Sequence, residues 1–146
     1  MEIKTKRLNI KPCTGDLYER DEEVKPHIQL YLEELESDQE LLGWGVWLVF
    51  SQTDHQLIGD IGFKGKPVDG VVEVGYGISP DEQNKGYATE AVEALVNWAF
   101  QTGKVNKIVA ETLKTNEASI RVLEKLFMNK VEQDEHMVYW EKHIFH

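Results

Sequence analysis

The chain has 146 residues, 41% of them hydrophobic and 29% charged, which is typical of a soluble globular protein and predicts a single domain over residues 1–146. Its formal net charge is -10, and we expect no nucleic-acid partner because phosphate binding needs a concentrated basic face. No apolar run reaches the roughly 18 residues that span a bilayer, so we expect no membrane partner and a cytoplasmic location. The lone Cys13 can form no internal disulfide.

The first half of the chain predicts mostly antiparallel strands. Residues 3–11 alternate apolar and polar side chains until Pro12 ends the run, so we expect one strand there. Residues 18–42 are rich in Glu, with leucines at loose helical spacing, and predict two short helices. Residues 44–50 and 57–63 are dense in aromatic and β-branched side chains around a polar tip, which predicts a hairpin.

The second half predicts a strand, a helix and a strand that pairs in parallel with the first. Residues 71–78 form the first strand and residues 107–113 the second, with an amphipathic helix over residues 88–102 between them. A second amphipathic helix is expected over residues 118–126, and residues 131–144 supply the last one or two strands. The whole pattern predicts an α+β domain.

The stretch that opens the helix carries the functional signal. Gly86 and Ala88 are small, and the unpaired N–H groups and positive dipole at a helix start form an anion site that suits a pyrophosphate. The spacing matches neither the P-loop nor the dinucleotide-binding glycine motif. Gln83-x-x-Gly86-x-Ala88 instead resembles the Q/R-x-x-G-x-G/A acetyl-CoA signature of the GCN5-related N-acetyltransferase (GNAT) superfamily.

Two further segments resemble the same superfamily. Asn116 to Leu126 is similar to its N-x-x-S-x-x-V-L-E-K-L segment, and Thr5 to Pro12 is similar to the T-x-R-L-x-L-R-P start of the branch that includes the ribosomal-protein N-terminal acetyltransferases. Together these segments place the resemblance over nearly the whole chain, in the superfamily's order. The resemblance implies a three-layer GNAT-like fold, in which a mixed, mostly antiparallel sheet has helices on both faces and a splayed parallel strand pair.

The resemblance also implies the cosubstrate and its contacts. Acetyl-CoA would donate its acetyl group directly to a primary amine, such as a protein N-terminus, a polyamine or a small-molecule amine. A bulge at the strand end would splay the parallel strands and expose backbone groups to the thioester and pantetheine. The contacts implied are Tyr76, Gly77, Ile78, Gln83, Asn84, Lys85, Gly86, Tyr87, Ala88, Thr89, Asn116 and Ser119. The structural alternative is that Gly75 and Gly77 only relieve close strand packing.

Acyl transfer to an amine needs a proton acceptor for the nitrogen and a proton donor for the thiolate. Glu73 and Glu111 lie on the strands that would border the acetyl group, and either is a candidate acceptor. The resemblance implies Ser119 as the thiolate's donor, with Tyr139 as the alternative. Asn116 and Ser119 also suit a helix cap, which needs no catalytic role.

The remaining expectations concern metals, partners and rival functions. The five histidines show no metal-ligand spacing, so we expect no metal. The acidic residues within 18–42 favour a cationic acceptor. A homodimer is left open. The rival functions are a GNAT-like domain that binds CoA without turnover and an unrelated interaction domain. Phe127 stands where the superfamily usually has glycine, so we expect the last helix to end nearer Asn129.

Overall fold

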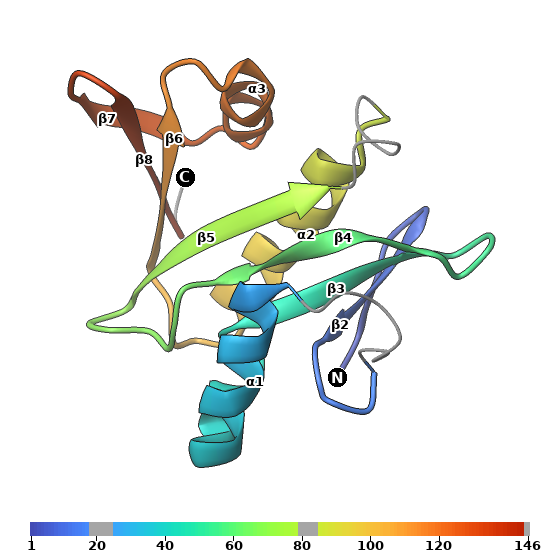
Figure 1. Cartoon of the computed structure of the whole chain (residues 1–146). Helices are drawn as coiled ribbons and strands as arrows, with labels where there is room; N and C mark the ends of the chain where they lie inside the picture. Colours follow the sequence, from blue (N-terminus) through green and yellow to red (C-terminus); the bar gives the residue numbers. More distant parts are fainter. Residues whose placement is uncertain (18–24, 79–84, 145–146) are drawn as a thin grey trace.

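The computed structural model describes residues 1–17, 25–78 and 85–144 and contains an eight-stranded sheet in the order β1-β2-β3-β4-β5-β6-β8-β7 (Figure 1). The strands are β1 (Ile3–Lys4), β2 (Leu8–Pro12), β3 (Val46–Ser51), β4 (Leu57–Phe63), β5 (Val71–Ile78), β6 (Lys107–Leu113), β7 (Asn129–Gln133) and β8 (Met137–His143). The helices are α1 (Pro26–Ser37), the 3-10 turn η1 (Gln39–Leu41), α2 (Tyr87–Gln101) and α3 (Glu117–Lys125). Among the strands of the described residues, only β5 and β6 pair in parallel, and α1 and α2 lie on opposite faces, which confirms the expected fold class.

The N-terminal segment differs from its prediction. Residues 3–11 form two short strands rather than one, with Ile3 paired to Ile10. Thr5 makes the turn, because its N–H donates to the carbonyl of Leu8 at 2.9 Å and its Oγ1 accepts from the N–H of Leu8 at 3.0 Å. The helices expected over residues 18–42 are α1 and η1, and residues 18–24 lie outside the described residues.

The parallel strands β5 and β6 stay paired for only part of their length. Their register runs from Val71 with Lys107 to Glu73 with Val109, and the strands then part. Beyond that point β5 pairs only with β4 and β6 only with β8. The β4–β5 register is unbroken up to Gly59 with Ile78, so this pairing does not contain the expected bulge. The parting leaves one edge of residues 74–78 without a partner strand.

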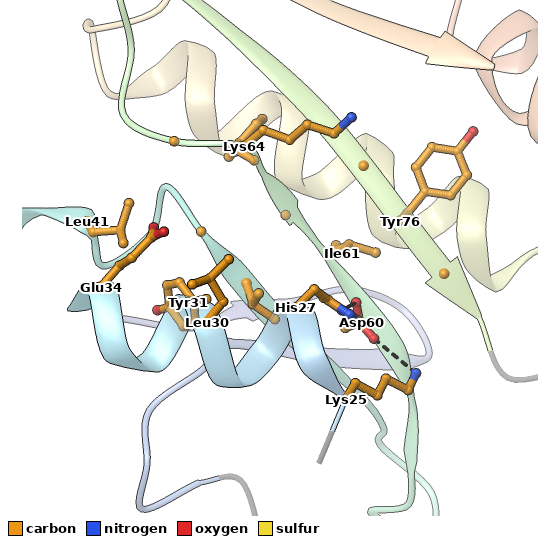
Figure 2. Close-up of a pocket in the computed structure, with 17 residues that line it drawn as sticks. Lys25, His27, Leu30, Tyr31, Glu34, Leu41, Asp60, Ile61, Lys64 and Tyr76 are labelled. Carbon is orange, nitrogen blue, oxygen red and sulfur yellow. Dashed lines mark hydrogen bonds and ion pairs between the residues drawn. The ribbon is translucent and has the colours of Figure 1, made fainter. Parts of the chain in front are cut away.

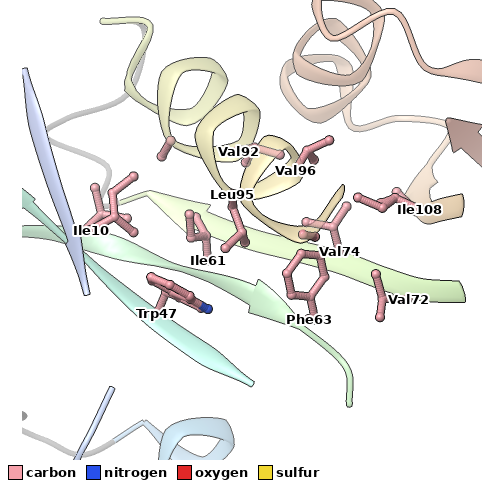
Figure 3. Packing of buried hydrophobic residues seen from close by; sticks show 14 of the residues in the cluster. Ile10, Trp47, Ile61, Phe63, Val72, Val74, Val92, Leu95, Val96 and Ile108 are labelled. Atoms are coloured by element: carbon pink, nitrogen blue, oxygen red, sulfur yellow. The ribbon is translucent and has the colours of Figure 1, made fainter. Parts of the chain in front are cut away.

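The main core lies between α2 and the sheet (Figure 3). The apolar stripe of α2 buries Ala91, Val92, Leu95, Val96 and Ala99. Val72 and Val74 of β5 face this stripe and are each 3% exposed. Burying a side chain of the size of Val or Leu contributes about 1.5–3 kcal/mol, so this face stabilises the fold.

Helix α3 does not extend toward Asn129. It ends at Lys125, and Phe127 itself takes the left-handed conformation with φ 61°. The N–H of Met128 donates to the carbonyl of Leu123 at 3.1 Å and that of Phe127 to Glu124 at 3.0 Å. These two bonds form a Schellman motif, in which glycine is usual because a Cβ costs about 1–2 kcal/mol at such a φ. The hydrogen bonds end the helix here despite that cost.

None of the helices in the described part of the chain is long and apolar enough to cross a membrane.

Candidate active site

The face of β4 and β5 that lies toward α1 is lined by glycine. Side chains alternate along a strand, so Gly75 and Gly77 lie on the opposite face from Val74. Among the described residues, a Cβ built on Gly77 would meet no atom within 4 Å, and one on Gly75 would meet only Cε of Lys64 at 3.8 Å. The two glycines therefore do not relieve a tight strand contact. They leave the backbone of β5 open to a ligand.

Helix α1 is anchored over this face by one aromatic contact. A Cβ on Gly45 would lie 2.2 Å from the ring of Tyr31, so the ring rests directly on the Gly45 backbone. The hydroxyl of Tyr31 donates to the carbonyl of Cys13 at 2.8 Å. Tyr31 and the fully buried Ile28 hold one side of α1, which leaves His27 and Glu34 for the neighbouring side.

A pocket of roughly 580 Å³ lies between α1 and the glycine-lined face, as Figure 2 shows. Leu30 and Leu41 supply apolar walls, and the backbone of Gly75 and Gly77 borders the space. The ionisable side chains that line it include Lys25, His27, Glu34, Asp60 and Lys64. Its size and mixed lining are those of a small-molecule site.

Asp60 binds two side chains from the start of α1. Its Oδ1 lies 2.9 Å from Nε2 of His27, and its Oδ2 accepts from Nζ of Lys25 at 3.3 Å. Asp60 lies opposite Gly77 in the β4–β5 pairing. Sequence reasoning missed the roles of Lys25, His27 and Asp60. The one signal available concerned His27, whose spacing from Leu30 and Glu34 places all three along one side of a helix.

The structure brings together Glu73 and Glu111, the two candidate proton acceptors, and adds a cation between them. Nζ of Lys64 lies 2.6 Å from Oε2 of Glu73 and 3.9 Å from Oε1 of Glu111. The Glu111 side chain is 42% exposed and that of Glu73 30%. Glu73 is therefore hydrogen-bonded to Lys64, whereas Glu111 lies beyond hydrogen-bond distance from it.

Asn116 and Ser119, the predicted cosubstrate contacts, lie at the start of α3, which is connected to β5 by a hydrogen bond. Asn116 caps α3, because its Oδ1 accepts from the N–H of Ser119 at 3.1 Å. The hydroxyl of Tyr76 donates to the carbonyl of Ser119 at 3.1 Å, and this bond connects β5 to α3. Burial raises the pKa of Tyr76 to about 12, so the phenol keeps its proton.

Tyr139, the alternative proton donor, is committed to a local contact. Its hydroxyl donates to Oδ2 of Asp134 at 2.9 Å, and this hydrogen bond raises the pKa of Tyr139. Tyr139 pairs with Glu111 across β6 and β8, so it lies next to one of the candidate carboxylates.

Helix α2 begins at a glycine in the left-handed conformation. Gly86 is its N-cap with φ 82°, in the left-handed region, and Tyr87, Ala88 and Thr89 follow in the first turn. Lys85 precedes the cap, whereas Gln83 and Asn84 lie outside the described residues.

Arg7 fastens this helix start to the N-terminal hairpin, a role that sequence reasoning missed. Its Nη1 donates to the carbonyl of Lys85 at 2.8 Å, and its Nε lies 2.7 Å from Oε1 of Glu90. The guanidinium also lies over the ring of Tyr87, at 4.4 Å from its centre. The only advance signal was the place of Arg7 in the Thr5 to Pro12 motif.

Within residues 1–17, 25–78 and 85–144, no group of three or more His, Cys, Asp or Glu side chains is placed to hold an ion.

The chain resembles known acetyltransferases in sequence and fold. The sequence model of the Acetyltransferase (GNAT) domain family matches residues 11–129. The uncharacterized N-acetyltransferase YjdG of Bacillus subtilis is 31% identical over 101 residues, which are 66% of this chain and 60% of that protein. The chain therefore spans less than two thirds of that relative's length.

Two solved structures share the fold at low identity. A ribosomal-protein-S5-alanine acetyltransferase from Vibrio fischeri superposes with a TM-score of 0.78 and 16% identity, over 98% of this chain and 96% of that one. RimL, a ribosomal L7/L12 alpha-N-protein acetyltransferase in complex with coenzyme A, gives 0.75 and 15%, over 98% of each chain. The family match over residues 11–129, within this shared fold, shows that the chain belongs to the GNAT acetyltransferase family.

Proposed function

We propose that the chain is an acetyl-CoA-dependent N-acetyltransferase that moves the acetyl group directly onto a primary amine. The observation that carries the proposal is the open backbone of Gly77, which borders a pocket of roughly 580 Å³ at the point where β5 has left β6. A thioester needs backbone donors around its carbonyl, and an unpaired strand edge offers them.

The two sides of the parted strands suit the two substrates. The left-handed Gly86 and the first turn of α2 present amides and the positive end of a helix dipole, which suit the pyrophosphate of acetyl-CoA. We assign the cosubstrate contacts to the residues from Lys85 to Thr89, to Tyr76–Ile78 and to the α3 start at Asn116 and Ser119. The amine would then enter from the pocket beneath α1.

Transfer without an acyl-enzyme is supported by the state of the one cysteine. Cys13 is fully buried, and burial raises the pKa of its thiol to about 11. A thiol that keeps its proton is a poor nucleophile.

The acceptor is proposed to be cationic before it reacts. Lys25 and Lys64 line the pocket but are both paired with carboxylates. Glu34 also lines it, and among the described residues its carboxylate has no ion-pair partner. An ammonium group is the ligand that such a carboxylate favours.

The proposal is tested by binding and turnover together. Titration calorimetry should detect acetyl-CoA binding, and a panel of primary amines should release the free thiol of coenzyme A from acetyl-CoA. Binding without thiol release for any amine would favour the rival, a CoA-binding domain without turnover. One observation speaks for that rival, because Glu73 and Glu111 both contact Lys64. Absence of binding would refute both.

A further inference from the structure

The pocket beneath α1 contains a histidine and a carboxylate from two different elements (Figure 2). His27 comes from the first turn of α1, and its side chain is 54% exposed. Asp60 comes from the middle of β4, and its side chain is only 14% exposed. Their 2.9 Å contact joins Nε2 of His27 to Oδ1 of Asp60. The histidine is thus held by the sheet while its ring stays accessible to a ligand.

Strand register places this pair beside Gly77. Asp60 and Gly77 are direct partners in the antiparallel β4–β5 ladder, where Cα atoms lie about 4.5–5.5 Å apart. Glu73 lies four residues earlier on β5, about 13 Å along the strand at the usual rise. Glu111 lies on β6, past the point where that strand has left β5. Of the three carboxylates, Asp60 is the one next to the expected thioester.

The contact with Asp60 fixes which nitrogen of His27 can accept a proton. An ionised carboxylate only accepts hydrogen bonds, so Nε2 carries the hydrogen that Oδ1 receives. In the neutral ring Nδ1 then has the free lone pair. A histidine held in one tautomer by a carboxylate is the arrangement that deprotonates nucleophiles in Ser-His-Asp enzymes.

We infer that His27 is the proton acceptor for the amine, with Asp60 as its positioning residue. The inference rests on the proposed acetyl transfer. The cationic acceptor first releases one proton to solvent, which leaves a neutral amine. The amine nitrogen bonds to the thioester carbonyl carbon, and the C–S bond breaks with its electron pair on sulfur. Nδ1 of His27 takes the second proton as this neutral nitrogen attacks. The thiolate is protonated from solvent, and the imidazolium returns its proton there, so the reaction balances.

Other titratable groups share the pocket, so a pH profile must be compared between variants. Among the described residues, those that line it with His27 are Lys25, Tyr31, Glu34, Asp60, Lys64 and Tyr76. His27→Gln leaves all of them in place and keeps an amide that can donate to Asp60. It removes only the proton acceptor.

The kinetic test compares His27→Gln with a matched histidine variant. His27→Gln should lower kcat by about 10²- to 10⁴-fold, the usual range for a general base. It should also abolish the low-pH limb of the kcat profile and leave coenzyme A affinity unchanged. Asp60→Asn should give a smaller loss. His136→Gln is the control, because His136 is 77% exposed beside Glu135 and does not line the pocket; it should change nothing.

A second measurement does not depend on turnover. Nitrogen-15 NMR of the imidazoles should show neutral His27 as the Nε2–H tautomer, and Asp60→Asn should reduce that preference. A dominant Nδ1–H tautomer overturns the inference, as does a His27→Gln enzyme with normal kcat and an intact low-pH limb. A wild-type protein that acetylates no amine would overturn the proposed function. A wild-type protein that is active, with a His27→Gln variant equally active, would overturn only the role of His27, so the two failures are distinguishable.

Discussion

The two faces of β4 and β5 are built from alternating residues of the same strands, yet one face is packed with buried side chains and the other borders a pocket. On the α2 face, Ile61 and Val74 are 2% and 3% exposed and pack with Leu95, which is fully buried. On the α1 face, Gly75 and Gly77 leave an open backbone beside a pocket of roughly 580 Å³. Because the period of a strand is two, one segment can hold the fold together on one side and bind substrates on the other.

The largest effect is expected on the filled face. Leu95→Ala removes a fully buried side chain from α2 and should lower the free energy of unfolding by about 2–5 kcal/mol. Glu93→Ala on the exposed side of the same helix is the control and should stay within about 0.5 kcal/mol. Chemical denaturation measures both. If Leu95→Ala unfolded as easily as wild type, the α2 face would not be the stabilising one.

The open face should show the reverse pattern. Gly77→Val adds a side chain whose Cβ lies more than 4 Å from every atom of the part of the chain that the structure describes. The free energy of unfolding should not fall. The value of kcat/KM should drop about 10²-fold, because the new side chain would keep the amine and the thioester from reaching the geometry needed to react. Thiol-release kinetics and denaturation on the same sample measure the two quantities. A stability loss without a rate loss would reverse the assignment of the two faces.

What sequence predicted follows the same division. The regular elements were predictable, because Val71 to Ile78 and the α2 stripe carry the periods of a strand and a helix. The N-terminal hairpin was not, because a run that alternates across a Thr5 turn reads like one continuous strand. Phe127 was misjudged for another reason, since the local backbone hydrogen bonds of the Schellman motif hold it in a conformation that its side chain disfavours.

The pocket was the least predictable part. His27 and Asp60 are 33 residues apart, and they meet because Tyr31, which rests on a bare Gly45, and the buried Ile28 fix the position of α1. Lys64 joins Glu73 to Glu111 through contacts between strands, which no local pattern records. Motifs indicated the loop that opens α2, because that chemistry depends on adjacent residues.

Substitutions at the two glycines that flank α2 can separate a role of its first turn in acetyl-CoA binding from the effect of backbone strain. Gly86 precedes α2 and Gly103 follows it, with φ 82° and 78°, so Gly86→Ala and Gly103→Ala should each cost about 1–2 kcal/mol of stability. Only Gly86→Ala should weaken acetyl-CoA binding, roughly tenfold, the value of one hydrogen bond to a charged group. Calorimetry on both variants measures this. If both variants bound acetyl-CoA with equal affinity, the assignment of the pyrophosphate to the start of α2 would be wrong.

The smallest effect concerns the acceptor and distinguishes a charged pocket from a charged surface. Glu34 lines the pocket, whereas its neighbour Glu33 is exposed elsewhere on α1. Glu34→Gln should raise KM for cationic amines roughly two- to fivefold, since an exposed ion pair contributes about 0.2–1 kcal/mol. Glu33→Gln removes the same charge from the protein and should leave KM unchanged.

Ionic strength adds the deciding comparison. The KM difference between Glu34→Gln and wild type should shrink as the salt concentration rises, because the Debye screening length falls to about 8 Å near physiological ionic strength. A neutral amine of similar shape should show no difference at any salt concentration. If both variants raised KM equally, the acidic residues of α1 would act only through the overall charge of -10. The pocket would then select its acceptor by shape, through the walls formed by Leu30 and Leu41.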